Sequence, residues 1–157
     1  MSRPDIRSLE CIVLPVGPCD WLLPAVCVAE IVRYQPLAKV TGPQACIGLL
    51  GWNDGDVPVV DLGLAAADPH PITHVRAIAV LNRTIADSPW PFWAMVLSGL
   101  PRRRRVSATM ISRSESAAPV CPGSCVHAGA EEFLIPELGW LQRDQLPPVT
   151  WAEQGMS

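Results

Sequence analysis

The segment Asn53-Asp54-Gly55-Asp56 concentrates oxygen-bearing side chains of the kind that bind calcium. An EF-hand loop also needs a glutamate at its twelfth position, but counting twelve residues from Asn53 or Asp54 leads to Leu64 or Ala65. The segment lies between two apolar runs, where Asp-Gly is typical of a tight β-hairpin turn because Gly55 tolerates a positive φ. We therefore predict a hairpin turn here rather than a metal loop.

Cys121, Cys125 and His127 are residue types that bind zinc. A tetrahedral zinc site needs four ligands, which usually come as two pairs. His70 and His74 have a spacing that suits a second pair, but no feature of the sequence brings the two segments together. We expect no metal site and keep zinc binding as an alternative.

Enzymatic motifs are missing from the sequence. A cysteine or serine nucleophile needs a base and an oxyanion site, yet the chain has three histidines and no G-x-S-x-G segment. It also has no phosphate loop and no dinucleotide-binding glycine motif. We therefore expect no catalytic residues, no cofactor and no enzymatic activity.

Arg102–Arg105 forms a basic cluster, and along a strand its members would alternate between the two faces. A charged strand edge exposed to water explains such a cluster, because charge protects edges from pairing with other chains. The alternative is an OB-like module that binds single-stranded nucleic acid, which needs aromatic rings beside basic residues. Suitable rings lie nearby in Trp90, Phe92 and Trp93, but the net charge of −3 argues against this alternative.

Glu30 stands in an apolar strip. If residues 26–34 form a strand, Glu30 shares one face with Val26, Val28, Val32 and Tyr34. A carboxylate in that position is costly unless it is paired or lies on a surface that a partner covers. The alternative is a strand end that emerges into water. We predict that Glu30 takes part in binding a partner protein.

Short strands are the elements that must position these residues, since 17 prolines leave few windows long enough for a stable helix. We predict strands at 11–16, 20–24, 26–34, 47–52, 57–62, 75–82, 92–100 and 132–135, and one short helix at 136–145. No helix-length segment separates the strands. This favours an all-β fold of two small antiparallel units in series over one parallel sheet.

The strand predicted at 92–100 is apolar on both faces. A small barrel buries only its inward face, so the outward face must pack against the second unit, a helix or a partner protein. The apolar runs are too short to cross a bilayer, and we find no signal peptide at the N-terminus. The six cysteines are therefore expected to be reduced thiols in a cytoplasmic protein.

A series of segments follows in a recognisable order, namely LPV, DWLLP, VAEIVRY, GLLGWNDGDVPVVDL, RAIAVLN, PFWAMVLSGLPRRRRV and EEFLIPELGWL. Over residues 11–146 this order resembles the CheW-like adaptor family of bacterial chemosensory systems, and most closely the ChpC type of chemosensory pili and twitching motility. The resemblance implies two five-stranded SH3-like β-barrels packed side by side, at about 11–65 and about 75–146, with a short C-terminal helix. Residues 1–10 are expected to be a flexible lead-in and 147–157 a tail.

The resemblance also implies a non-enzymatic scaffold in two-component signal transduction. Such an adaptor couples the cytoplasmic tip of a methyl-accepting chemoreceptor to the regulatory domain of a CheA-type histidine kinase, without nucleic acid or membrane insertion. The partner-binding residues that it implies are Val28, Glu30, Asn53, Leu97, Leu100 and Arg102.

The chain departs from the family pattern in the hairpin. Where the family has Arg and Gly, this chain has Asn53 and Asp54. The planar fork of arginine holds a carboxylate bidentately, and asparagine carries no charge. Any ion pair centred on that arginine is therefore absent, so coupling to receptor or kinase is expected to be weakened or re-specified.

Overall fold

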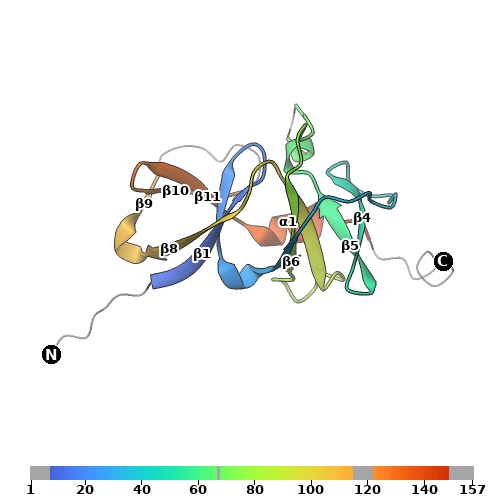
Figure 1. Ribbon diagram of the computed structural model, residues 1–157, viewed down its shortest axis with the longest axis horizontal. Coiled ribbons are helices and arrows are strands. Elements are labelled where there is room, and N and C mark those ends of the chain that lie inside the picture. The colour runs from blue at the N-terminus through green and yellow to red at the C-terminus, as the bar shows by residue number, and fades with distance from the viewer. Residues whose placement is uncertain (1–7, 67, 115–121, 149–157) are drawn as a thin grey trace.

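The computed structural model describes residues 8–66, 68–114 and 122–148. These residues form two β-sheets that curl into barrel-like units lying side by side, with one short α-helix at their boundary (Figure 1). We call the units A and B. The predicted all-β class, the two units and the C-terminal helix are confirmed.

Unit A is a six-stranded sheet with the strand order β8-β1-β2-β11-β10-β9. Its strands are β1 (Ser8–Pro15), β2 (Asp20–Pro24), β8 (Arg102–Ser107), β9 (Ile111–Arg113), β10 (Gly123–Ala128) and β11 (Glu131–Pro136). Two 3₁₀ turns, η1 (Ala25–Cys27) and η3 (Ala108–Met110), follow β2 and β8. The short strand β9 pairs with β10 and makes six strands where five were expected.

Unit B is a five-stranded sheet with the strand order β3-β6-β7-β5-β4. Its strands are β3 (Val28–Val32), β4 (Cys46–Trp52), β5 (Gly55–Val60), β6 (Ala77–Asn82) and β7 (Phe92–Leu97), and the 3₁₀ turn η2 (Leu62–Ala65) follows β5. Each of these strands overlaps a strand that the sequence predicted. The pairs are antiparallel except for β5 and β7, which are parallel.

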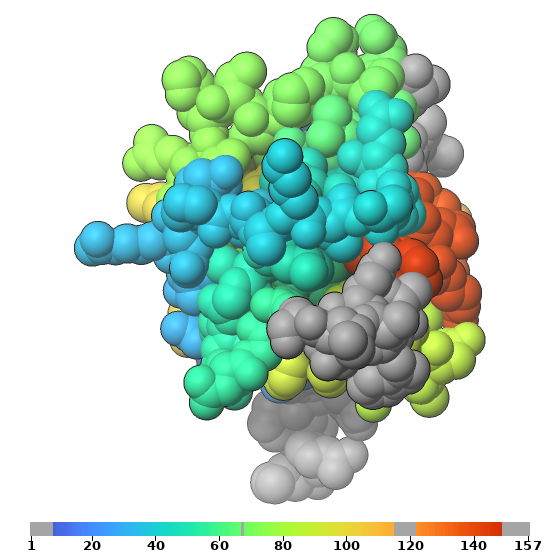
Figure 2. All heavy atoms as spheres, turned by 90° about the vertical axis from the view of Figure 1, so that its right-hand side faces the viewer, coloured from blue at the N-terminus to red at the C-terminus, as the bar shows by residue number. Residues whose placement is uncertain are grey.

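The segment that follows β3 closes unit B. The Ala38 N–H donates to the Leu49 carbonyl at 2.9 Å, and the Leu49 N–H donates to the Ala38 carbonyl at 2.8 Å. A Cβ at Gly48 would lie 2.7 Å from the Ala38 oxygen, so this close approach requires glycine. Figure 2 shows the segment in light blue lying across the teal surface of β4 and β5.

The two units do not follow each other along the chain. β1 and β2 pair with β8 and β11, so unit A is built from both ends of the described chain. Unit B comes from the residues between, 28–97. This differs from the expected division into 11–65 and 75–146, because consecutive strands are often but not always neighbours in a sheet.

The described residues form three apolar clusters. One lies inside unit A and consists of Cys11, Val13, Leu22, Val106, Val126, Ala128 and Phe133. A second lies inside unit B and consists of Leu50, Val57, Val59, Ile78, Val80, Ala94 and Val96. The third, which we call the central cluster, has members from both units and from the helix, among them Leu14, Trp21, Leu81, Trp93, Met95, Leu97, Leu134 and Leu141.

The strand β7 contributes to two of these clusters, which explains its two apolar faces. Ala94 and Val96 point into unit B, and the alternate residues Trp93, Met95 and Leu97 point into the central cluster. Of the three coverings expected for the outward face, the second unit and the helix are those observed. The faces of β7 are therefore used in holding the two units together.

The helix α1 (Leu138–Asp144) lies within the predicted range 136–145 and is shorter than predicted, because Pro136 belongs to β11. Leu141 is fully buried. The Gln142 side chain accepts a hydrogen bond from the Thr84 N–H at 3.0 Å. The helix is therefore tied to the loop between β6 and β7.

The ends of the chain differ from the expected lead-in and tail. β1 begins at Ser8, so residues 8–10 belong to unit A. The Pro147 carbonyl accepts a hydrogen bond from the Trp90 indole at 2.7 Å, which fixes the first residue of the expected tail. Residues 1–7 and 149–157 lie outside the described residues.

The β4–β5 hairpin confirms the predicted turn, but the turn residues are Asn53 and Asp54. Their φ angles are 52° and 64°, whereas Gly55 is the first residue of β5. A two-residue loop with both φ angles positive is typical of a type I′ turn, which favours asparagine and glycine.

We expect Asp54→Gly to stabilise the protein by about 0.5–1 kcal/mol, because glycine has no Cβ to strain a positive φ. The matched control is Asp56→Gly, two residues later within β5, where the entropy of glycine should lower stability by about 0.5 kcal/mol. Urea unfolding of both variants and the wild type measures the difference. Shifts of the same sign in both variants would contradict this assignment of the turn.

Candidate partner-binding surfaces

Val28 and Glu30 of β3 and Asn53 of the β4–β5 turn lie at one edge of unit B, which we call the lower edge because the hairpin of β4 and β5 turns there in Figure 1. β3 begins at this edge, with Val28 opposite Leu81 near the end of β6. The β4–β5 turn lies at the same edge, since Trp52 beside the turn contacts Glu30. Three of the six predicted partner-binding residues are therefore brought to one edge.

The connection from β7 of unit B to β8 of unit A lies on the opposite side, which we call the upper edge (Figure 1). It contains Leu100 and leads into Arg102, the first residue of β8. Leu97 is the last residue of β7. It pairs with Ala77, the first residue of β6, so β7 ends at the edge where β6 begins. Leu100 is 64% exposed, whereas Leu97 has no exposed surface. We correct the expectation for Leu97, which is a core residue, because alternation cannot tell a face covered by the same chain from one left for a partner.

A β-bulge in β3 separates Val28 from Glu30. Two residues of β3 oppose one residue of β6 at this point, so Ala29 is extra and the alternation is reset. Val28 packs toward the central cluster, whereas Val32, on the same side of the strand as Glu30, packs toward the core of unit B. The single face that the sequence predicted for these residues is therefore split in two.

Glu30 is exposed beside two aromatic rings. The Trp52 indole N–H donates to a Glu30 carboxylate oxygen at 3.0 Å. The rings of Trp52 and Phe92 meet edge to face, with centroids 4.9 Å apart and planes at 65°. Among the described residues, no cation lies within salt-bridge distance of Glu30. The cost of a charge in an apolar strip points to Glu30 in the sequence, whereas no sequence signal points to Trp52, which is 22 positions away.

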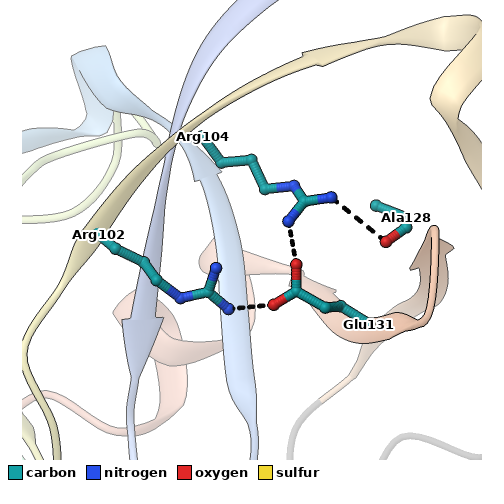
Figure 3. Close-up of polar contacts among 4 residues, drawn as sticks. All are labelled: Arg102, Arg104, Ala128 and Glu131. Carbon is teal, nitrogen blue, oxygen red and sulfur yellow. Dashed lines mark hydrogen bonds and ion pairs between the residues drawn. The ribbon is translucent and has the colours of Figure 1, made fainter.

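Arg102 and Arg104 share the carboxylate of Glu131 (Figure 3). Both guanidinium groups also lie near the ring of Phe133, at 5.7 and 5.6 Å from its centroid. Arg104 donates a further hydrogen bond to the Ala128 carbonyl at 3.3 Å. The acidic group that meets this pair of arginines thus comes from the same chain, and Arg102 is held within unit A.

Glu131 should make the stability of unit A depend on pH. Hydrogen bonding from Arg102, with the charges of both arginines, holds the pKa of Glu131 below its usual range. A carboxyl with a lowered folded pKa contributes stability above its unfolded pKa, about 4.3, and loses it as the pH falls through the folded value.

We therefore expect wild type to exceed Glu131→Gln in unfolding free energy by a constant amount near neutral pH, and this difference to shrink below about pH 4.3. Urea unfolding at pH 7, 5, 4 and 3 measures it. Glu137→Gln, which alters an exposed carboxylate without a side-chain cap hydrogen bond, is the control. If the stability difference between wild type and Glu131→Gln did not change with pH, the ion-pair role of Glu131 would be contradicted.

The aromatic residues near the arginines do not form a platform for stacking bases. Trp93 has no exposed surface, and Trp90 is only 6% exposed. Phe92 packs against Trp52. A single-strand binding module needs exposed rings beside basic residues, so this arrangement gives the nucleic-acid alternative no support.

Residues with metal-binding or nucleophilic chemistry are dispersed. Cys125 is buried in the central cluster, His127 lies 3.7 Å from Glu132, and Cys121 lies outside the described residues. Within the described part of the chain, no group of three or more His, Cys, Asp or Glu could hold a metal ion. Burial raises the pKa of the thiols Cys11, Cys27 and Cys46, which disfavours a reactive thiolate.

Unit A carries an apolar pocket that no pattern in the sequence predicts. Its volume is about 430 Å³, and its lining includes Leu9, Leu22, Pro24, Val106, Ile111 and Ile135. Leu9 is 50% exposed and Ile135 is 38% exposed. Clustered exposed apolar side chains mark interaction sites. Leu9 belongs to β1, but Glu10 separates it from the apolar run that begins at Cys11, so the sequence pattern predicts a strand only from residue 11.

The fold is similar to that of a known scaffold protein. No described helix has the length and apolar character needed to span a membrane. No protein-family model matches the sequence, and no curated protein matches it at a significant level. The crystal structure of the scaffolding protein TtCheW from Thermoanaerobacter tengcongensis matches with a TM-score of 0.70 and 12% identity, covering 90% of this chain and 92% of that one. The chain therefore has the CheW-like fold that the sequence resemblance implied.

Proposed function

We propose that this protein is a non-enzymatic cytoplasmic adaptor that couples the tip of a methyl-accepting chemoreceptor to the regulatory domain of a CheA-type histidine kinase. The observation that carries the proposal is the likeness in fold to a CheW scaffolding protein over 90% of the chain. The segments that resemble the ChpC type support a pathway linked to type IV pili and twitching motility.

An adaptor that holds two partners at once needs two separate surfaces, and two candidate surfaces lie on different units. We assign the lower edge of unit B, with Val28, Glu30 and Asn53, to the receptor tip. Leu100 and Arg102 are proposed as further receptor contacts at the upper edge. We assign the apolar pocket of unit A to the kinase regulatory domain. Exposed apolar area with a few charges for register suits transient partners.

The test is a binding assay with the purified chain, the receptor-tip fragment and the kinase regulatory domain encoded in the same genome. Wild type should bind both partners. Glu30→Arg should weaken capture of the receptor fragment and leave kinase-domain binding unchanged. Leu9→Asp should have the reverse effect, because a charge in an apolar pocket is costly. Circular dichroism shows whether each variant keeps its fold.

The outcomes separate the assignment of surfaces from the function. If both variants bound both partners as wild type does, the assignment of the two surfaces to the two partners would be contradicted. Wild type that binds neither partner would contradict the adaptor function itself. A fluorescence anisotropy titration with oligonucleotides at low and physiological salt examines the alternative, since strong and salt-sensitive binding would favour a nucleic-acid module.

A further inference from the structure

We infer that the lower edge of unit B receives a basic side chain of the receptor, arginine in preference to lysine, against Glu30 and Trp52. The inference rests on the proposed function and adds the chemistry of the group that this surface binds.

The charge of Glu30 is the first observation behind the inference. Within the described residues, its carboxylate is bonded by the neutral indole N–H of Trp52 and by no cation. Two acids of unit A are placed differently, since Glu131 lies between two arginines and Glu10 lies 3.5 Å from Arg105. Unit B thus leaves the charge of Glu30 for a cation from outside.

Neither the hairpin nor β3 pairs Glu30 with a positive charge. The hairpin next to Trp52 contributes Asn53, Asp54 and Asp56, all exposed and none of them basic. Arg33, on the segment that leaves β3, forms no ion pair with Glu30 among the described residues. Arg83, which follows β6 at this edge, donates to the Ser88 carbonyl at 3.0 Å and forms no ion pair with Glu30 among the described residues. The hairpin side of the lower edge is therefore acidic, and a potential of this sign attracts basic groups of a partner and disfavours acidic ones.

The geometry favours a planar cation. The indole N–H of Trp52 holds one oxygen of Glu30, so the direction of the carboxylate is set before a partner arrives, which lowers the entropy cost of binding. The half-buried rings of Trp52 and Phe92 brace each other edge to face. Tryptophan is the best aromatic partner for a cation. A guanidinium can bond a carboxylate and stack on a ring at once, whereas an ammonium is a point charge.

Glu30→Gln tests the inference, because glutamine keeps an acceptor for the Trp52 indole and removes the charge. We expect its dissociation constant for the receptor-tip fragment to rise about tenfold, with a weaker dependence on salt. Asp56→Asn removes the same charge from an exposed position in the neighbouring hairpin, and we expect its dissociation constant to stay within about twofold of wild type.

A charge-swap experiment identifies the group that binds. Each basic residue of the receptor fragment is changed to glutamate and paired with Glu30→Arg. One combination of a receptor substitution with Glu30→Arg should restore the binding that each of the two substitutions weakens on its own. At that receptor position, arginine to lysine should weaken binding to wild type by about threefold, because a bidentate contact is lost.

The inference and the proposed function fail in different ways. If wild type binds the fragment and Glu30→Gln binds equally well, the inference is overturned and the adaptor function stands. Equal losses in Glu30→Gln and Asp56→Asn would also overturn it, since the charge would then act only at long range. Wild type that does not bind the fragment would overturn both.

Discussion

Leu97→Ala is expected to lower the free energy of unfolding by about 3 kcal/mol, within the range of about 2–5 kcal/mol for buried leucines. Leu97 has no exposed surface and lies in the central cluster, where β7 meets residues of unit A. Truncation removes apolar contacts and leaves a cavity that close-packed neighbours fill only in part. Because domains are stable by about 5–15 kcal/mol, the loss is a large share of the total. Urea unfolding followed by tryptophan fluorescence measures it.

Leu100→Ala is the matched control, since the same substitution is made three residues further along the chain. Leu100 is 64% exposed, so the expected change in stability is within about 0.5 kcal/mol. If Leu97 were a partner contact, Leu97→Ala would weaken binding and spare stability. That result, or a larger loss of stability in Leu100→Ala, would contradict the burial of Leu97 between the units.

Asp61→Ala is expected to lower the free energy of unfolding by about 2–4 kcal/mol, because a hydrogen bond to a charged group is worth about 1.5–3 kcal/mol and one buried and one half-buried donor would be left unpaired. Asp61 is 3% exposed. Its carboxylate accepts from the Gly63 N–H at 2.9 Å and from the Ile72 N–H at 3.0 Å. The side chain thereby holds the connector between β5 and β6 against unit B.

Hydrogen exchange locates the effect of Asp61→Ala, since the amides of Gly63 and Ile72 should lose protection before the rest of unit B. Asp56→Ala changes an exposed aspartate in the same strand region, and its stability should stay within about 0.5 kcal/mol of wild type. Asp61→Asn keeps one acceptor oxygen, so its stability should lie between those of Asp61→Ala and Asp56→Ala. Equal stabilities of Asp61→Ala and Asp56→Ala would show that Asp61 does not hold the connector.

Local patterns in the sequence were sufficient for the fold class and for much of unit B. The two apolar runs around Asn53 and Asp54 predicted β4, β5 and their turn, because turn chemistry and alternation act over a few residues. The unusual position of Glu30 was also visible, since a charge in an apolar strip is a local feature. The sequence pattern predicted a positive φ at Gly55, whereas the structure has positive φ angles at the two preceding residues, Asn53 and Asp54.

Features that depend on contact between distant segments were not accessible in this way. The bulge at Ala29 turned Val28 and Glu30 to different faces, and the indole of Trp52 reached Glu30 from another strand. Likewise, the arginines of β8 found Glu131 of β11.

The amino-acid pattern thus established short strands, a hairpin and an exceptional carboxylate. The pairing of β1 with β8 and the partners of each charge followed from how distant segments meet within each unit, and the burial of Leu97 followed from how the two units pack. The physical reason is that alternation records whether a face is apolar, which is a property of a few neighbouring residues. What covers that face depends on the surfaces that meet across the whole chain, and the energy of their contact is spread over many residues that are far apart in sequence.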